Sequence, residues 1–218
     1  MLPETPNSIV LQRLTAGIIF PPVGIDRQAL ANFYAQASAP FEFTQFNLLP
    51  DGARLAVSGA PESDDLIIQP SRAQVNMALP PGVAYEAVVG RAMAQFDAAR
   101  QFLRLSQYQA FGVKIVGAFS LGEACADFLE HRLIRQDAPL DRLGLGRVGT
   151  GFRFNFHREG VWDVRIEPFF RDVSQIYVEV DAQKTDPFND LKAAQSWMED
   201  VERYFRRELL DFLQSLPA

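Results

Sequence analysis

The sequence of 218 residues contains only one cysteine, Cys125, and two histidines, His131 and His157. A single cysteine excludes an internal disulfide bond and any site built from several thiolates, and it is typical of a reducing, cytoplasmic location. Two histidines cannot complete a zinc site on their own, because such a site needs three or four protein ligands. We therefore expect no resident metal ion and no other cofactor.

Positive charge is also scarce, since 21 Lys and Arg residues stand against 27 Asp and Glu residues, for a formal net charge of −6. Both parts of the chain are acidic. Residues 1–109 contain 7 Lys and Arg against 9 Asp and Glu, and residues 110–218 contain 14 against 18. Nucleic-acid binding depends on clustered cations that neutralise phosphates. The charge therefore disfavours nucleic acid as a partner.

Long apolar runs are absent as well. No run approaches the roughly 18 residues of a transmembrane helix, and the first twenty residues lack the basic and apolar segments of a signal peptide. We expect no membrane partner. The apolar content is nevertheless 48%, with 18 phenylalanines, which is enough to form a packed core in a chain of this length.

Three short segments recur in the same order at offsets of 98 to 100 residues. The matches join residues 17–20 to 117–119, 52–57 to 151–156, and 68–70 to 166–168. A recurring spacing of this kind indicates a duplication. We therefore interpret residues 1–109 and 110–218 as two diverged copies of one β-α-β(3–4)-α unit, merged into one domain.

Local signals agree with this interpretation in the first unit. A strand at 9–20 precedes a helix that Asp26 can cap. Strand-like runs follow at 41–49, 53–58, 65–69 and 74–79. A long helix then begins near Tyr85, where apolar residues alternate spacings of four and three.

The second unit repeats this order. A strand at 111–119 precedes a helix for which Ser120 and Glu123 fit a capping box. Strands are expected at 151–157, 161–167 and 175–181, and Asp186 with Pro187 predicts the start of the last helix. Residues 144–149 fit a dinucleotide-binding glycine pattern but lead into a strand, so we expect a loop there.

Alternation of apolar and polar residues in the strands of the second unit predicts an antiparallel sheet with one apolar face. The fold class is therefore α+β, and we expect the long helices to cover the apolar face. This order of elements resembles the topology of TATA-binding-protein-like folds. The strand ending at Asp181 and the helix carrying Trp197 and Phe205 also resemble the end of a sporadically distributed family of uncharacterised bacterial proteins, which implies no known activity.

The catalytic motifs are weak. Cys125 and His131 are six residues apart on one expected helix, so their side chains point in different directions, and we expect a buried thiol and an exposed histidine. Asp163, Glu167, Glu179 and Asp181 share one face of the expected sheet and could hold a divalent cation. Arg153 and Arg165 share that face, which favours cross-strand ion pairs instead. No catalytic residue is assigned.

Arg54 and Arg153 occupy equivalent positions in the two units, so they could bind an anionic ligand or an acidic partner surface. The candidate binding residues on this polar face are Arg54, Arg153, Arg165, Glu167, Tyr177 and Glu179.

An open sheet face and exposed strand edges favour a non-enzymatic protein-binding or assembly module, whose partner is another protein or a second copy in a homodimer. Two alternatives stay open at this point: a divalent-metal-dependent enzyme that uses the carboxylates, and a nucleic-acid-binding module suggested by the fold resemblance alone.

Overall fold

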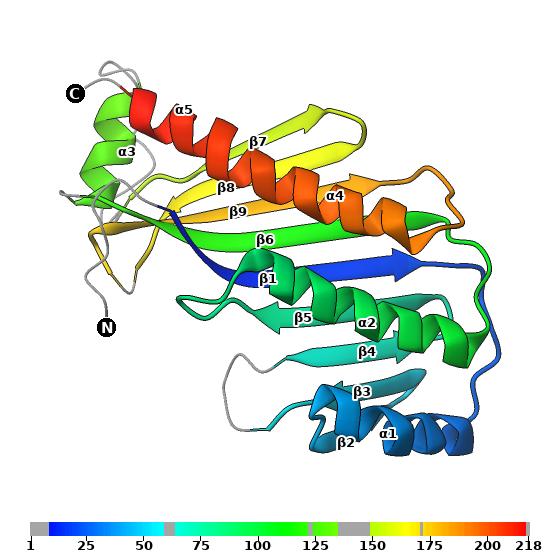
Figure 1. The fold of residues 1–218 in the computed structure, drawn as a ribbon. Coiled ribbons are helices and arrows are strands. Elements are labelled where there is room, and N and C mark those ends of the chain that lie inside the picture. The colour runs from blue at the N-terminus through cyan, green and yellow to red at the C-terminus, as the bar shows by residue number, and fades with distance from the viewer. Residues whose placement is uncertain (1–8, 59–63, 122–123, 135–148, 171, 217–218) are drawn as a thin grey trace.

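The computed structural model describes residues 9–58, 64–121, 124–134, 149–170 and 172–216 (Figure 1). Within these ranges the chain is an α+β protein with one open antiparallel sheet of nine strands. The predicted fold class is confirmed at this level. Residues 144–148 of the glycine pattern lie outside the described residues.

The nine strands are β1 (Ile9–Ile19), β2 (Gln45–Leu49), β3 (Gly52–Ala56), β4 (Asp65–Gln69), β5 (Arg72–Ala78), β6 (Ala110–Ser120), β7 (Phe152–His157), β8 (Val161–Pro168) and β9 (Gln175–Lys184). The helices are α1 (Arg27–Phe41), α2 (Tyr85–Leu103), α3 (Cys125–Leu133), α4 (Leu191–Tyr204) and α5 (Leu210–Ser215), and a π-helical segment, Phe205–Leu209, joins α4 to α5. The strand order across the sheet is β2-β3-β4-β5-β1-β6-β9-β8-β7.

The longest strands, β1 and β6, form the centre of the sheet. They pair antiparallel, with Thr15 opposite Lys114 and Gly17 opposite Gly112. Each of the two then pairs on its outer side with the last strand of its own half, β1 with β5 and β6 with β9. The seam between β1 and β6 therefore joins two parts of the chain that are about one hundred residues apart.

The helices pack on the sheet through apolar residues. In α2 the residues spaced by three and four are buried, including Ala92 and Phe96, and this helix contacts β5 and α4. Helix α4 contacts β6 and buries Met198 and Val201, while α1 contacts β3. In Figure 1, α1, α2 and α4 lie on the same side of the sheet.

Two of the predicted helix starts differ from the structure. Ser120 is the last residue of β6, where it pairs with Gln175, so α3 begins only at Cys125 after an N-cap alanine; Glu123 lies outside the described residues. Strand pairing with β9 thus takes the serine that a capping box would need. In contrast, the predicted cap of α1 is confirmed, because Asp26 accepts a hydrogen bond from the backbone of Ala29 at 2.7 Å.

The last helix begins at Leu191 and not after Asp186. Asp190 is its N-cap and accepts a hydrogen bond from the backbone N–H of Lys192 at 2.9 Å. Phe188 is held in an extended conformation by a β-bridge with Tyr108. The rings of these two residues also stack on each other. This tertiary contact keeps the segment after Asp186 out of the helix.

Candidate functional site

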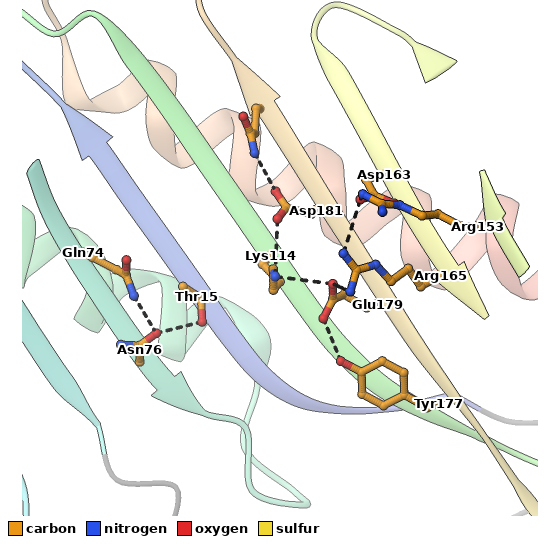
Figure 2. A network of polar contacts seen from close by, with 11 residues as sticks. Thr15, Gln74, Asn76, Lys114, Arg153, Asp163, Arg165, Tyr177, Glu179 and Asp181 are labelled. Atoms are coloured by element: carbon orange, nitrogen blue, oxygen red, sulfur yellow. Dashed lines mark hydrogen bonds and ion pairs between the residues drawn. The ribbon is translucent and has the colours of Figure 1, made fainter. Parts of the chain in front are cut away.

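One row of side chains crosses the middle of the sheet and joins residues that lie opposite each other on neighbouring strands. Eight of its nine members are polar, and the whole row points to one face. In strand order the row is Gln45, Ala56, Asp65, Asn76, Thr15, Lys114, Asp181, Asp163 and Asn155. Figure 2 shows its central part in front of the strands, with helices behind the sheet. We call this surface the polar face.

In the half of the sheet that contains β1 to β5, the polar face is a chain of hydrogen bonds. Thr15 Oγ1 donates to Asn76 Oδ1 at 2.8 Å, and Gln74 Nε2 donates to the same oxygen at 3.2 Å. Asn76 Nδ2 in turn donates to Asp65 Oδ1 at 2.6 Å. Arg54 Nε donates to the other oxygen of Asp65 at 2.7 Å. The chain of neutral groups thus ends at one ion pair.

In the half that contains β6 to β9, the same region is charged. Glu179, with only 6% of its surface exposed, lies between two cations, and its Oε1 is 3.4 Å from Lys114 Nζ and 3.5 Å from Arg165 Nη1. Neither contact has hydrogen-bond geometry, whereas Tyr177 donates its hydroxyl proton to Glu179 Oε2 at 2.7 Å. Burial, and then this hydrogen bond to Glu179, raise the pKa of Tyr177, so the phenol stays protonated and acts as a donor.

Asp163 and Asp181 complete this charged network. Arg153 donates to both oxygens of Asp163, with Nε to Oδ1 at 2.8 Å, and Arg165 approaches Asp163 from the other side at 3.7 Å. The hydrogen bonds from Arg153 are the main reason that the pKa of Asp163 lies below its usual value. Lys114 Nζ is 3.4 Å from Asp181 Oδ2. The contacts form one connected set (Figure 2).

Across both halves, the ion pairs of the polar face join four cations to four carboxylates. The cations are Arg54, Lys114, Arg153 and Arg165, and the carboxylates are Asp65, Asp163, Glu179 and Asp181. The network is therefore neutral in sum. These ion-paired groups together therefore provide no net attraction for phosphates and no repulsion of an uncharged ligand.

A furrow runs along the seam beside this network. Its floor is the Gly17–Gly112 pair, and its walls are Gln74, opposite Gly17, and Gln183, opposite Gly112. The furrow has a volume of about 560 Å³. Thr15 and Lys114 lie at one end, and Ile19, Arg72 and Ala110 at the other.

In the described part of the chain, no packing contact explains the two floor glycines. A Cβ atom at Gly17 would come no closer than 3.7 Å to Ala73 O, and one at Gly112 no closer than 3.8 Å to Gln183 Cγ, which are ordinary distances. Gly117 differs, because a Cβ there would lie 3.0 Å from the ring of Phe205. Glycine weakens a strand, so unforced glycines in a strand are typical of places where a ligand or another backbone approaches closely.

The glutamine walls have unused acceptors. Gln74 Nε2 donates to Asn76, and Gln183 Nε2 donates to Asp181 Oδ1 at 3.4 Å. Among the described residues, no donor contacts Oε1 of either glutamine. Each wall therefore presents a carbonyl oxygen, and a carboxamide matches a peptide group in both donor and acceptor.

The structure brings four of the six predicted binding residues into one network: Arg153, Arg165, Tyr177 and Glu179. Arg54 belongs to the other half, and Glu167 is exposed outside the network. Six strands lie between β3 and β7, so Arg54 and Arg153 are about 34 Å apart across the sheet at the usual strand spacing. They are therefore too far apart to hold one small ligand between them, and each faces its own aspartate. Binding of an acidic partner surface stays a prediction.

The sequence analysis missed the furrow. Lys114 is a single charge within an apolar strand, and the walls and floor of the furrow come from four strands of both halves. The available signal was the pair of glycines, Gly17 and Gly112, each inside a run that otherwise reads as a good strand.

The described residues do not form a metal centre, because no three His, Cys, Asp or Glu side chains among them gather around one point. Cys125 is buried, as expected, and burial raises the pKa of its thiol. A protonated, enclosed thiol is a poor nucleophile. His131 and His157 are both exposed, also as expected.

None of the helices in the described ranges has the length and apolar content needed to cross a bilayer. Comparison with models of known protein families gave no match, and comparison with curated proteins gave none either.

Proposed function

We propose that this chain is a non-enzymatic protein-binding module, built from two diverged copies of one unit, and that an extended segment of a partner protein lies in the furrow along the β1–β6 seam. The observation that carries the proposal is the row Gln74–Gly17–Gly112–Gln183, a glycine floor between two amide walls. A cytoplasmic location agrees with the single, buried thiol of Cys125.

The strand order supports the duplication. Outward from β1 the neighbours are β5, β4, β3 and β2, and outward from β6 they are β9, β8 and β7. In each half the first strand is central and the others follow in reverse chain order. Two unrelated segments would have no reason to share this path, whereas two copies of one unit would inherit it.

Equivalent ion pairs support it further. Arg54 of β3 pairs with Asp65, 11 residues later, and Arg153 of β7 pairs with Asp163, 10 residues later. Both arginines donate through Nε, at 2.7 and 2.8 Å. The glycine matches at 17 and 117 are not equivalent, however, because Gly117 faces the ring of Phe205 and Gly17 lines the furrow.

With the helices on one side of the sheet, the polar face is the surface left for a ligand. A peptide in extended conformation has a narrow backbone with a donor and an acceptor on every residue. It fits a furrow whose floor has no side chains and whose walls have carboxamides. From Thr15 to Ile19 the floor spans about 13 Å, which accommodates about four extended residues.

The neutral network favours this ligand over the two alternatives. All four cations of the ion-pair network are engaged by carboxylates, so nucleic acid would have to displace these ion pairs to gain phosphate contacts from them. Each of the four carboxylates lies within 4 Å of a cation, and these cations would compete with a divalent metal for the carboxylate oxygens. An uncharged, extended peptide requires neither rearrangement.

The test is a selection from a displayed library of random peptides against the native chain. We expect enriched peptides, and we expect their affinity to fall at least about tenfold in Gly112→Val and Gly17→Val, because the new side chains fill the floor. Valine favours strands, so both variants should keep the native melting temperature or exceed it.

Ile67→Phe is the matched control, since Ile67 lies opposite Gln74 on the polar face but outside the furrow. Its affinity for the enriched peptides, measured by fluorescence anisotropy, should equal that of the native chain. The proposal fails if no peptide is enriched, or if Gly112→Val binds the enriched peptides as tightly as the native chain.

A further inference from the structure

The strand β7 forms one edge of the sheet and pairs with β8 alone. About half of its backbone N–H and C=O groups therefore point away from the sheet, where none of the described strands lies beside them. Natural edges are protected by short strands, charged side chains, covering segments, bulges or proline. In β7 the pairing runs without a bulge from Phe152 to His157, and the strand contains no proline.

The apolar side of this edge is only partly covered by the helices. Phe152, Phe154 and Phe156 alternate on the side that faces the helices, where Phe156 contacts Tyr204 and Phe154 contacts Phe212. Phe154 is 40% exposed and Phe212 is 37% exposed. Two adjacent aromatic rings at an open strand edge are typical of an interaction surface.

The geometry points to a second copy of this chain as the occupant of the edge, with β7 paired antiparallel to β7 of that copy about Phe154. In this register Phe152 lies opposite Phe156 of the second copy, and Arg153 lies opposite its Asn155. The phenylalanines of both copies then form one apolar stripe on the helix side. The two sheets become one continuous sheet.

Charge selects this register over its neighbours. Pairing centred on Arg153 would place the two arginines opposite each other, and pairing centred on Asn155 would place Arg153 opposite His157. Slipping by a single residue would turn the phenylalanines of one copy to the polar face of the other. The register about Phe154 places all three phenylalanines of each copy opposite phenylalanines, where the registers about Arg153 and Asn155 place only two. It also gives Arg153 an amide neighbour that can accept a hydrogen bond.

The opposite edge of the sheet is the natural comparison. Strand β2 is shorter, and its apolar side contacts α1, where the ring of Tyr34 stacks on Phe46. Leu48 of β2 is still 48% exposed, which makes it a matched control. A six-residue pairing is a small interface, so we expect a dissociation constant in the micromolar range. This dimer is weaker than an obligate dimer, which buries a larger interface.

The first experiment is sedimentation equilibrium of the native chain over a range of micromolar concentrations. The mass should rise from 24.4 kDa toward 48.8 kDa, which is 2 × 24.4. Phe154→Glu should remain monomeric, while Leu48→Glu should dimerise like the native chain. A native chain that stays monomeric throughout overturns the proposal, and so does a dimer that Leu48→Glu dissociates and Phe154→Glu does not.

The second experiment varies Asn155, which lies opposite Asp163 in its own chain and opposite Arg153 of the second copy in the proposed dimer. Asn155→Arg should weaken the dimer about tenfold, because each new arginine lies opposite Arg153 of the second copy and the dimer then contains two such pairs of like charges. Asn155→Asp should strengthen it.

Within one chain the order is reversed, since an arginine at position 155 would attract Asp163 and an aspartate there would repel it. Melting temperatures measured in the monomeric Phe154→Glu background should therefore be higher with arginine than with aspartate at this position. The proposal is wrong if dimer affinity follows the same order as monomer stability, or if the two substitutions shift the dimer in the same direction. Peptide binding in the furrow is unaffected by either outcome, because the β7 edge is four strands away from β1.

Discussion

The half of the sheet that contains β1 to β5 and the half that contains β6 to β9 differ most in the three polar positions nearest the seam. One half has Thr15, Asn76 and Gln74 there, and the other has Lys114, Asp181 and Glu179. In each set the first residue lies opposite the second, and the third lies two residues before the second in the same strand. The first set is joined by neutral hydrogen bonds and the second by ion pairs.

The difference shows that one strand arrangement accepts either kind of polar network, at unequal cost. A neutral hydrogen bond contributes about 1 kcal/mol, and its loss leaves a group that water can often satisfy. A buried carboxylate such as Glu179 is costly unless cations offset its desolvation. The second half should therefore be more sensitive to the loss of one partner.

The largest expected effect comes from Lys114→Thr, which gives the second half the residue found in the first. Glu179 then keeps only Arg165 as a cationic partner, and Asp181 loses its cation. We expect a loss of about 2 kcal/mol in the free energy of unfolding, less than for a fully buried pair because Lys114 is partly exposed. Urea unfolding at pH 7 measures it.

The counterpart in the first half is Thr15→Val, which removes the hydrogen bond to Asn76 but keeps the shape of the side chain. Its cost should be about 1 kcal/mol or less. An equal or larger loss for Thr15→Val would contradict the contrast between the two halves.

An effect smaller than that of Lys114→Thr is expected at the ion pairs Arg54–Asp65 and Arg153–Asp163. Arg54→Gln should cost about 1 kcal/mol, because Asp65 is 4% exposed and loses its charged partner. Arg153→Gln should cost less, since the pair of Arg153 with Asp163 is more exposed and Arg165 also faces Asp163. The two unfolding midpoints in urea, compared at pH 7, rank the pairs.

From the ion pair of Arg153 with Asp163 we also predict a pH dependence of stability. The pKa of Asp163 is lowered in the folded chain, so its ion pair stabilises the fold above the usual pKa of an aspartate, about 3.9. This stabilisation disappears as the pH falls through the lower, folded value. The difference between the native chain and Arg153→Gln should therefore be present at pH 7 and shrink as the pH falls below about 3.9. A difference that stays the same in acid would exclude this cause.

Much of the fold followed from local patterns. The alternation of Val164 and Ile166 with Asp163 and Arg165 predicted the two faces of β8. As expected, Val164 and Ile166 are buried, whereas Asp163 and Arg165 are partly exposed. Asp26 marked a helix start by its side chain alone. Such signals depend on neighbours in the sequence, which is why they could be recognised without coordinates.

The features that failed depend on distant contacts. Asp186 and Asp190 are both good N-caps before a helix, and only the bridge of Phe188 with Tyr108 decides between them. Likewise, the furrow exists because Gly17 and Gly112 meet across the seam, and the register between strands so far apart in the chain is set by the packing of the whole sheet. No local pattern specifies that register.

The most direct test of the central claim, that the two halves are copies of one unit, is to transfer the neutral set into the second half. The triple variant Lys114→Thr, Asp181→Asn and Glu179→Gln gives positions 114, 181 and 179 the residues of Thr15, Asn76 and Gln74. Its free energy of unfolding in urea should recover at least half of the loss measured for Lys114→Thr alone, because the neutral groups can hydrogen-bond as they do beside β1. A triple variant that is as unstable as Lys114→Thr, or less stable, would show that the two positions are not equivalent.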